Sequence, residues 1–383
     1  ADETNVLTYE DVITCRDVCF IGKTVDLSVC PIMSTLTVRN ASVTFATLVA
    51  VSLYSLRRRV TSKWINLHKS LSALDDLTKR TVVITGATDG LGYQLAVDLV
   101  RRGCGTIVIG CRNVERGTII AENIKAEAGL VSTTTVVKCI QLDLSSLVSV
   151  REFAQKLKLS HPKVFALVCN AGVWVPMNQK RKTVDGFEVH FGVNHLAHFL
   201  LVRLLTDNLL ASGDSETRVV MVSSSLLKGG KINFVKKDFV HEGRMCEGEK
   251  QIPETRVPTG YADSKLMNYL MCQQLSRNFN DSNISTYSVC PGWCQTNLSR
   301  EVKLPWYKKL MVAPIFLLFQ RSSRQGSQNL VFCTIEKKAN LISGALYKDG
   351  VIDYEESEHA RIRQKEASEN LWSLSEDLIS KCT

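Results

Sequence analysis

The sequence lacks the cysteine spacings that indicate a metal site or a disulfide framework. Its 13 cysteines include no C-x-x-C pair and no cysteine and histidine cluster at the spacing of zinc ligands. Several lie within apolar runs, as in IGCR and ALVCN, where cysteine usually serves as a small buried hydrophobe. We therefore expect no bound metal, and reduced thiols in a domain that faces the cytosol.

The chain also lacks internal repeats, low-complexity segments and any concentration of positive charge. Lys and Arg number 47 against 38 Asp and Glu, but the positive residues are spread out, which argues against a nucleic-acid-binding face. An anionic membrane surface or an anionic cofactor remains compatible with the excess. With 45% hydrophobic residues among 383, the chain can bury a full core, as a globular protein does.

Charged side chains are absent from residues 40–56, NASVTFATLVAVSLYSL, and three arginines follow at 57–59. A helix of this length reaches about 26 Å, slightly short of the roughly 30 Å hydrocarbon core of a bilayer. The basic flank predicts a membrane anchor at 40–59 with the downstream domain in the cytosol. The alternative is a buried core helix.

The segments around this anchor carry weaker signals. Residues 1–39 are expected to form an N-terminal extension, and one hypothesis is that Met33 is the natural start of the protein. Residues 60–78 are expected to be a linker.

From Lys79 onward, strand and helix patterns alternate. Short apolar runs rich in β-branched residues predict strands at 81–85, 106–110, 135–142, 164–170, 218–224, 284–290 and near 344–347. Helical spacing occurs at 92–103, 146–158, 187–210 and 261–278. This alternation predicts an α/β fold over residues 79–350, a doubly wound Rossmann-type parallel sheet with helices on both faces. Residues 351–383 are expected to be a helical extension.

The turn after the first predicted strand reads TGATDGLG, residues 85–92. Gly86, Gly90 and Gly92 would let the main chain turn tightly and approach a pyrophosphate at the positive end of the next helix. A glycine pattern alone is weak evidence, but here the required strand and helix flank it. We therefore expect a dinucleotide to bind at this turn.

The second predicted strand ends without the carboxylate that an NAD enzyme places near the ribose hydroxyls. Arg112 and Asn113 stand there, and Arg112 could pair with a 2′-phosphate, so NADP is preferred over NAD. The alternative is that Arg112 is an ordinary solvated side chain. Asp143, after the third strand, is a candidate for the adenine edge or, alternatively, a cap of the next helix.

Tyr261 and Lys265 are four residues apart on a predicted helix, and therefore share one face. A nearby ammonium favours phenolate, so we expect the tyrosine pKa to fall from about 10 and the group to act as a general acid/base. Hydride transfer to a carbonyl needs such a group. Ser224 could hold the carbonyl oxygen, and Asn194 a relay water. The alternative for an isolated Y-x-x-x-K is a surface pair.

The order of these motifs resembles the short-chain dehydrogenase/reductase family, of the classical type, over about residues 79–350. TGATDGLG is similar to its cofactor motif, NAG at 170–172 to the segment that steadies the sheet, and PGWCQT at 291–296 to the turn that contacts the nicotinamide carboxamide. The resemblance implies a catalytic tetrad of Asn194, Ser224, Tyr261 and Lys265. The cofactor contacts that it implies are Thr85, Gly86, Thr88, Asp89, Gly90, Leu91, Gly92, Arg112, Asn113, Asp143, Leu144, Asn170, Ala171, Gly172, Tyr261, Lys265, Pro291, Gly292 and Thr296.

Finer features resemble the membrane-anchored, retinol dehydrogenase-like branch of this family. They include RNVERG at 112–117, DGFEVHFGVNHLAHF at 185–199 and KGGKINF at 228–234, although Ala197 stands where the branch usually has glycine. This resemblance implies an NADP(H)-dependent oxidoreductase that interconverts a lipophilic alcohol and its aldehyde or ketone, with retinol and retinal leading. Steroids, polyprenols and lipid-derived aldehydes remain alternatives. So does a non-catalytic, NADP-binding membrane scaffold.

The same resemblance implies a substrate lid at about 298–325, which contains the apolar run LPWYKKLMVAPIFLLF. This run would dip into the membrane interface or, alternatively, pack on the core. The expected partners are a lipophilic substrate, a membrane and a second copy in a homodimer. The expected location is the endoplasmic reticulum membrane, with the catalytic domain facing the cytosol.

Overall fold

The structure is a computed structural model. It describes residues 49, 51–58, 74, 76–129, 134–176, 179, 181–232, 259–299, 311, 313–314, 316, 318–353 and 358–382. The chain divides into two compact units, residues 1–56 and 57–383. Most of the predicted anchor and linker, and all of residues 1–39, lie outside the described residues. Residues 51–58 are helical, and no helix among the described residues is both long and apolar enough to cross a membrane.

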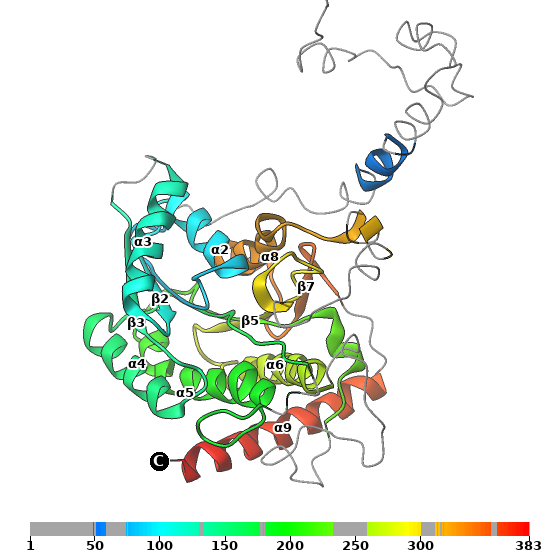
Figure 1. The fold of residues 1–383 in the computed structure, drawn as a ribbon. Coiled ribbons are helices and arrows are strands. Elements are labelled where there is room, and N and C mark those ends of the chain that lie inside the picture. Colours follow the sequence, from blue (N-terminus) through cyan, green and yellow to red (C-terminus); the bar gives the residue numbers. More distant parts are fainter. Residues whose placement is uncertain are drawn as a thin grey trace, which may run out of the picture. The chain divides into compact units, whose positions relative to one another are not determined.

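The described residues of the larger unit form an eight-stranded sheet with the order β3-β2-β1-β4-β5-β6-β7-β8 (Figure 1). The strands are β1 (Thr81–Thr85), β2 (Thr106–Cys111), β3 (Val136–Gln141), β4 (Ala166–Cys169), β5 (Arg218–Val222), β6 (Ser285–Val289), β7 (Leu346–Lys348) and β8 (Val351–Ile352). All neighbours pair in parallel except β7 and β8. Strand order reverses between β1 and β4, which is where open α/β sheets bind ligands. The predicted doubly wound parallel sheet is confirmed.

The antiparallel edge strand β8 was not predicted. Asp349 and Gly350 join it to β7, and both have positive φ, 55° and 72°. Two consecutive residues in this region are typical of a type I′ hairpin, whose twist matches that of the strands.

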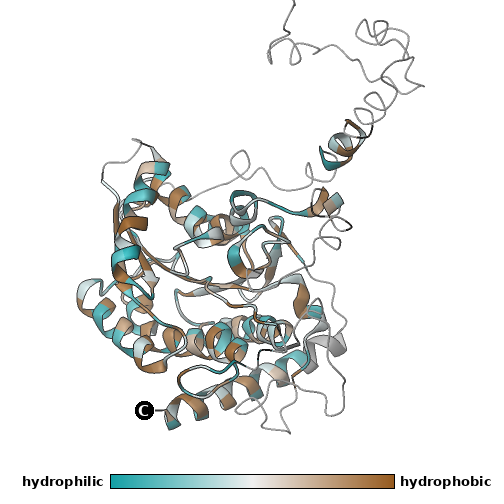
Figure 2. Ribbon diagram, in the orientation of Figure 1, coloured by the Kyte–Doolittle hydropathy of each residue, from teal (hydrophilic) through white to brown (hydrophobic). Residues whose placement is uncertain are grey.

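Helices cover both faces of the sheet. They are α2 (Gly90–Arg101), α3 (Val114–Ala128), α4 (Leu147–Ser160), the π-helical turn η4 (His190–Leu196), α5 (Ala197–Leu210), the 3-10 turn η5 (Ser225–Gly229), α6 (Thr259–Asn278), the 3-10 turns η6 (Asn297–Ser299) and η7 (Lys338–Asn340), α8 (Ser323–Ile335) and α9 (Glu358–Lys381). Most of these helices carry both hydrophilic and hydrophobic stretches (Figure 2).

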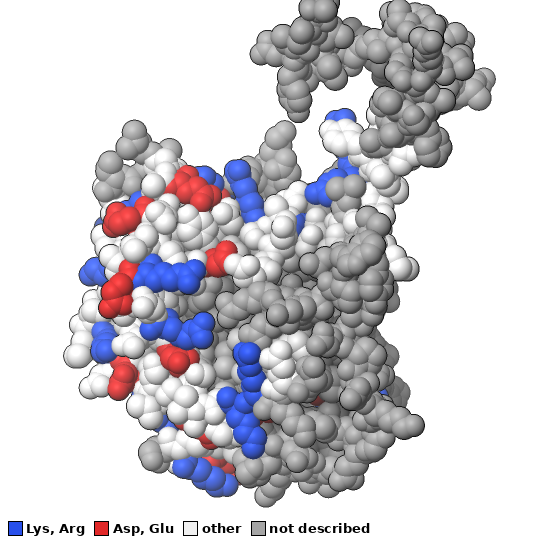
Figure 3. All heavy atoms as spheres, viewed as in Figure 1, with Lys and Arg blue, Asp and Glu red and all other residues white. Residues whose placement is uncertain are grey.

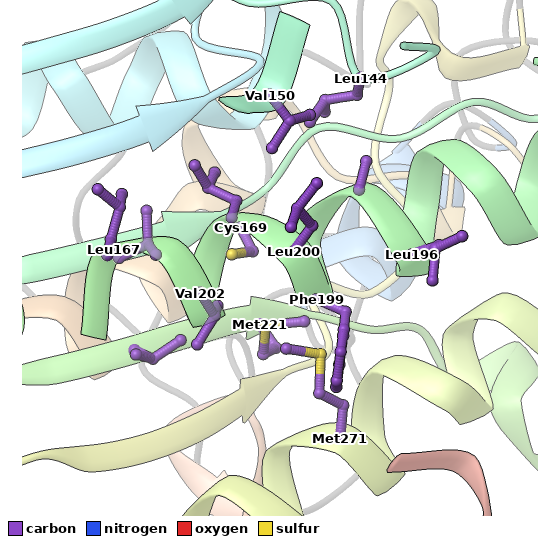
Figure 4. Packing of buried hydrophobic residues seen from close by; sticks show 14 of the residues in the cluster. Leu144, Val150, Leu167, Cys169, Leu196, Phe199, Leu200, Val202, Met221 and Met271 are labelled. Atoms are coloured by element: carbon purple, nitrogen blue, oxygen red, sulfur yellow. The ribbon is translucent and has the colours of Figure 1, made fainter. Parts of the chain in front are cut away.

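Alternate strand residues bury into two separate cores. Val83 and Leu167 face a cluster built with α4, α5, α6 and α9, part of which is drawn in Figure 4. Ile84 and Val168 face the opposite cluster, built with α2, α3 and α8. Because both faces are covered, the central strands β1, β4 and β5 are buried along nearly their whole length, without alternation.

The C-terminal helix α9 packs against α5 and η4. Trp372 meets Phe199 of α5 edge to face at 4.9 Å, and the Ser375 hydroxyl lies 3.1 Å from His195 Nε2. Leu371 is 1% exposed. The described surface seen in Figure 3 mixes Lys and Arg with Asp and Glu.

Candidate active site

The glycine turn between β1 and α2 packs directly on the segment after β4. Gly86 has a φ of 67°, and a Cβ there would lie 2.8 Å from Ala171 Cα. A Cβ on Gly92 would lie 2.6 Å from Asn170 Nδ2 and 2.7 Å from the Gly86 carbonyl oxygen. Only glycine fits such close approaches of main chain, because any side chain would displace a neighbouring strand end.

Thr85 and Asn170 hold this turn with their own polar groups. Thr85 Oγ1 accepts hydrogen bonds from the amides of Asn170 and Ala171, both at 3.0 Å. Asn170 Nδ2 donates to the carbonyls of Thr85 (2.9 Å) and Gly86 (3.0 Å). The side chains of these two predicted cofactor residues are therefore used to shape the turn.

His198 of α5, which sequence reasoning missed, completes the arrangement. Its Nδ1 lies 3.0 Å from the Asn194 carbonyl, which can only accept, so Nε2 is the acceptor from the Thr85 hydroxyl at 2.9 Å. Burial lowers the pKa of His198 to about 4, so the ring is neutral at pH 7. In the sequence, only the position of His198, one helical turn after Asn194, indicated that it lies near the site.

Asp89, one of the predicted cofactor contacts, uses both carboxylate oxygens within the protein. Its Oδ1 accepts from the Gly90 amide at 2.7 Å and caps α2, while Oδ2 accepts from Asn297 Nδ2 of η6. Asp89 therefore ties the turn to the segment after β6 and takes the first helix amide. Thr88 is half-buried, and the Leu91 side chain lies against Gly326 of α8.

The carboxyl ends of β2 and β3 carry the residues predicted for the adenosine. Arg112 is exposed directly after β2, and Asn113 Oδ1 accepts from the Arg116 amide at 2.7 Å and caps α3. Asp143 accepts from the amide (2.9 Å) and hydroxyl (2.8 Å) of Ser145. No carboxylate stands between β2 and α3.

One alternative at β3 needs correction. The cap of α4 is Ser146, so the alternative that Asp143 caps this helix is wrong. Leu144 is 8% exposed and its side chain packs in the core (Figure 4), so the cofactor contact predicted for it would come from its main chain. The sequence pattern cannot separate a lining residue from a core residue when both follow a strand.

Tyr261 and Lys265 lie in α6, buried at 5% and 3% exposure, with Lys265 Nζ 5.5 Å from the centre of the tyrosine ring. Lys265 Nζ donates to the carbonyl of Val222, the last residue of β5, at 3.0 Å. Ser224 follows this strand end, half-buried, and its Oγ accepts from the Leu226 amide at 3.3 Å. The lysine is thus fixed beside the strand end that carries the serine.

Asn194 lies in the π-helical turn η4, where a single α-helix over 187–210 was predicted. Its Nδ2 donates to the Val173 carbonyl (3.1 Å) and to Ser264 Oγ (3.0 Å), and its Oδ1 accepts from the Val173 amide (2.8 Å). A Cβ on Gly172 would lie 3.3 Å from Asn194 Oδ1 and 3.5 Å from Lys265 Nζ. Such turns are frequent at functional sites because the extra residue redirects a side chain.

The expected lowering of the tyrosine pKa is wrong for this state of the protein. Burial raises the pKa of Tyr261 above its ordinary value, and burial lowers the pKa of Lys265 to about 8. Removal from water is the largest cause of both shifts, although Lys265 Nζ lies only 5.5 Å from the centre of the tyrosine ring. The tyrosine therefore keeps its proton at neutral pH.

Sequence reasoning also missed the aromatic wall around Tyr261. Trp174 stacks on its ring at 5.6 Å, and His190 meets it edge-on at 6.2 Å. His190 Nε2 accepts from the Val175 amide at 3.0 Å, and its Nδ1 lies 2.6 Å from Glu188 Oε1. No acceptor among the described residues reaches the buried Trp174 Nε1. Two sequence features could have indicated this wall: Trp174 closely follows NAG, and His190 lies in the segment FEVHF.

The turn after β6 is held by Arg321, which pairs with Asp349 between β7 and β8. Gly292 has a φ of 79°, and a Cβ there would lie 2.9 Å from the Arg321 guanidinium. Arg321 donates to the Pro291 carbonyl (3.4 Å) and pairs with Asp349 (Nη2 to Oδ2, 2.9 Å). The methyl group of Thr296 would lie 3.3 Å from a Cβ on Gly90, so this segment closes against the glycine turn.

Much of the predicted lid, including residues 300–310, lies outside the described residues. Its last residues belong to α8, which starts with a capping box between Ser322 and Gln325.

The chain is similar to known proteins over most of its length. The family described as short chain dehydrogenase matches residues 80–235. The chain is 34% identical to retinol dehydrogenase 11 of Homo sapiens over 306 residues, 79% of this chain and 86% of the relative. It is 34% identical to retinol dehydrogenase 12 of Mus musculus over 300 residues, 78% and 86% of the two chains.

Solved structures share the fold at low identity. The Pseudomonas aeruginosa RhlG/NADP active-site complex is 20% identical with a TM-score of 0.54, covering 71% of this chain and 94% of that chain. A short-chain type dehydrogenase/reductase from Mycobacterium marinum is 17% identical with a TM-score of 0.55 and the same coverage.

The chain belongs to the short-chain dehydrogenase family. Within this family it falls in the retinol dehydrogenase-like branch, so the predicted resemblance is confirmed. It is therefore an oxidoreductase that acts on alcohol or carbonyl groups with a nicotinamide cofactor.

Proposed function

We propose that this protein is an NADP(H)-dependent oxidoreductase that interconverts a lipophilic alcohol and its aldehyde or ketone, with retinol and retinal as the leading pair. The observation that carries the proposal is the buried, protonated Tyr261, with Trp174 stacked on its ring and Lys265 Nζ 5.5 Å from the ring centre. The names of the similar retinol dehydrogenases support the substrate class.

The residues of the chain fit a dinucleotide. The turn at Gly86 and Gly92 has no room for side chains, so it presents main chain at the start of α2. Asn113 and the exposed Arg112 lie where the adenosine ribose is expected, and Arg112 is suited to a 2′-phosphate. When bound, the nicotinamide supplies or accepts the hydride.

The side chains near Tyr261 then have distinct roles. In the reductive direction the Tyr261 hydroxyl donates its proton to the carbonyl oxygen, and Ser224 Oγ holds that oxygen by a hydrogen bond. Lys265 orients the ribose, and it supports the phenolate that forms when the proton leaves. Asn194 Oδ1 can accept from a water that returns a proton to the lysine.

Trp174 and His190 exclude water from this tyrosine. An indole face stacked on the catalytic ring offers an apolar wall to an extended hydrocarbon substrate. The unpartnered Nε1 of Trp174 could also donate to an oxygen of the substrate.

The remaining parts of the proposal concern location and assembly. We place the protein on the endoplasmic reticulum membrane through residues 40–59, with the catalytic domain in the cytosol, and we include a homodimer. The segment at 298–325 would admit the substrate from the membrane.

Cofactor consumption by the full-length, detergent-solubilised protein tests the function. NADPH or NADH is offered with retinal, a steroid ketone or a long-chain aldehyde, in separate reactions. We expect retinal turnover with NADPH. Turnover of another carbonyl would reassign the substrate, and NADPH binding without any turnover would favour the scaffold alternative.

Replacing Arg112 with alanine tests the choice of cofactor. Loss of a charge-assisted contact worth about 1.5–3 kcal/mol is expected to weaken NADPH binding roughly 10- to 100-fold and to leave NADH binding unchanged. Fluorescence titration measures both affinities. Lys125→Ala, near the end of α3, is the matched control. Equal effects of Arg112→Ala on both cofactors would contradict the assignment.

A further inference from the structure

Two cysteines from neighbouring strands meet behind the proposed 2′-phosphate site. Cys111 is the last residue of β2, and Cys139 lies in β3, where it pairs with Ile109. Their sulfur atoms are 2.8 Å apart. Cys111 is buried and Cys139 is partly exposed, so the pair is closest to solvent on the Cys139 side.

Helix α3 packs against the two sulfur atoms, and Gly117 leaves room for them. A Cβ on Gly117 of α3 would collide with both Cys111 Sγ and Cys139 Sγ. The glycine therefore encloses the two thiols without separating them, and no side chain stands between the sulfur atoms.

The two thiols differ in their readiness to ionise. The hydrogen bond that Cys139 donates lowers the pKa of Cys111, and the same bond, together with burial, raises the pKa of Cys139. This asymmetry suits Cys111 to attack and Cys139 to resolve, because the thiolate is the nucleophile.

We propose that Cys111 and Cys139 are a redox modification site that closes to a disulfide on exposure to a peroxide. Cys111 sulfur attacks one oxygen of hydrogen peroxide; the O–O bond breaks and leaves a sulfenic acid and hydroxide, which takes up a proton to become water. Cys139 sulfur then attacks the sulfenic sulfur, the S–O bond breaks, and the leaving oxygen departs as water with the Cys139 proton. Two thiols lose two electrons, and one peroxide becomes two waters.

Closure acts on the turn that follows β2. A disulfide bond measures about 2.05 Å, so the sulfur atoms must approach by about 0.8 Å. Cys111 also loses the S–H that donates to the Asn113 carbonyl at 3.0 Å. Asn113 caps α3, and Arg112 lies between Cys111 and Asn113 in the sequence. Closure therefore shifts the turn that carries Arg112 and Asn113. The consequence for NADPH rests on the proposed function, whereas disulfide formation does not.

The test uses the reduced full-length protein, treated with hydrogen peroxide, alkylated and mapped by peptide mass spectrometry. We expect a peptide that links Cys111 to Cys139, absent in Cys139→Ser and retained in the control Cys382→Ser. NADPH affinity, measured by fluorescence, is expected to fall roughly tenfold on oxidation in the wild type, as on loss of one phosphate contact, and to resist peroxide in Cys139→Ser.

Each contrary outcome has a separate meaning. Independent alkylation or over-oxidation of the two cysteines, without a cross-link, would overturn the modification site. A cross-link with unchanged NADPH affinity would overturn its effect on the cofactor. Absence of NADPH binding by the reduced protein would count against the proposed function, while the mapped cross-link would still support the site.

Discussion

Replacing Tyr261 with phenylalanine is expected to lower kcat by about 10²- to 10⁴-fold, the usual contribution of a general acid. Phenylalanine keeps the ring that stacks on Trp174 and faces Lys265, so folding and NADPH binding should change little. Only the proton that reaches the carbonyl oxygen is removed. Steady-state kinetics with retinal, together with NADPH titration, would separate kcat from cofactor affinity.

A matched control is available on the same helix. Tyr269 of α6 is buried, and its hydroxyl accepts from Gln273 Nε2 at 3.0 Å. Tyr269→Phe should keep kcat within a few-fold of the wild type. If Tyr261→Phe were as active as Tyr269→Phe, the acid would have to be another group.

Replacing Lys265 with methionine is expected to abolish activity and to stabilise the cofactor-free protein. Burial lowers the pKa of Lys265 to about 8 from 10.5, so the folded protein bears the cost of a buried ammonium at pH 7. Converted at about 1.4 kcal/mol per unit, this sets an upper limit of about 3 to 4 kcal/mol. Methionine has similar volume and no charge, and the Val222 carbonyl keeps its hydrogen bond from Asn268 Nδ2 at 3.2 Å.

The same shift gives the wild type a defined dependence on pH. Between pH 8 and 10.5 the unfolded chain binds more protons at Lys265 than the folded protein does, so the free energy of unfolding rises with pH across this window. Tyr261 acts in the opposite direction, because its raised pKa makes stability fall above about pH 10. The rise should therefore be clearest between about pH 8 and 10.

Urea unfolding at pH 7 and at pH 9.5, without cofactor, measures this effect. The difference between Lys265→Met and wild type should be largest at pH 7 and shrink at pH 9.5. Lys228→Met, at an exposed lysine of η5, is the control and should shift stability by less than about 0.5 kcal/mol. A destabilised Lys265→Met at pH 7 would contradict a buried charge penalty.

Local patterns predicted most of the sheet. The TVVIT run became β1, and the alternation of strands and helices gave the parallel order, because βαβ units close in only one hand. The edge strand β8 and the π-helical turn η4 were not predicted. β8 has only two residues, too few to form a recognisable pattern. η4 depends on contacts of Asn194 with Val173 and Ser264, which are far away in sequence.

The candidate site likewise contains residues that the sequence indicated and residues that it did not. Tyr261, Lys265 and the glycines were recognisable because their chemistry needs those residue types at fixed spacing along one element. Trp174, His190 and His198 were not, because what they do depends on which side chain stacks or hydrogen-bonds across elements.

By itself the sequence determined the fold class, the family and the candidate chemical groups, since periodicity, glycine turns and the Tyr-Lys spacing are local properties. Only the tertiary structure decided the protonation of Tyr261, the burial of Leu144 and the meeting of Cys111 with Cys139. The physical reason is that pKa values and contacts depend on how far packing removes a group from water and on which neighbours it meets. Spacing along the chain specifies neither.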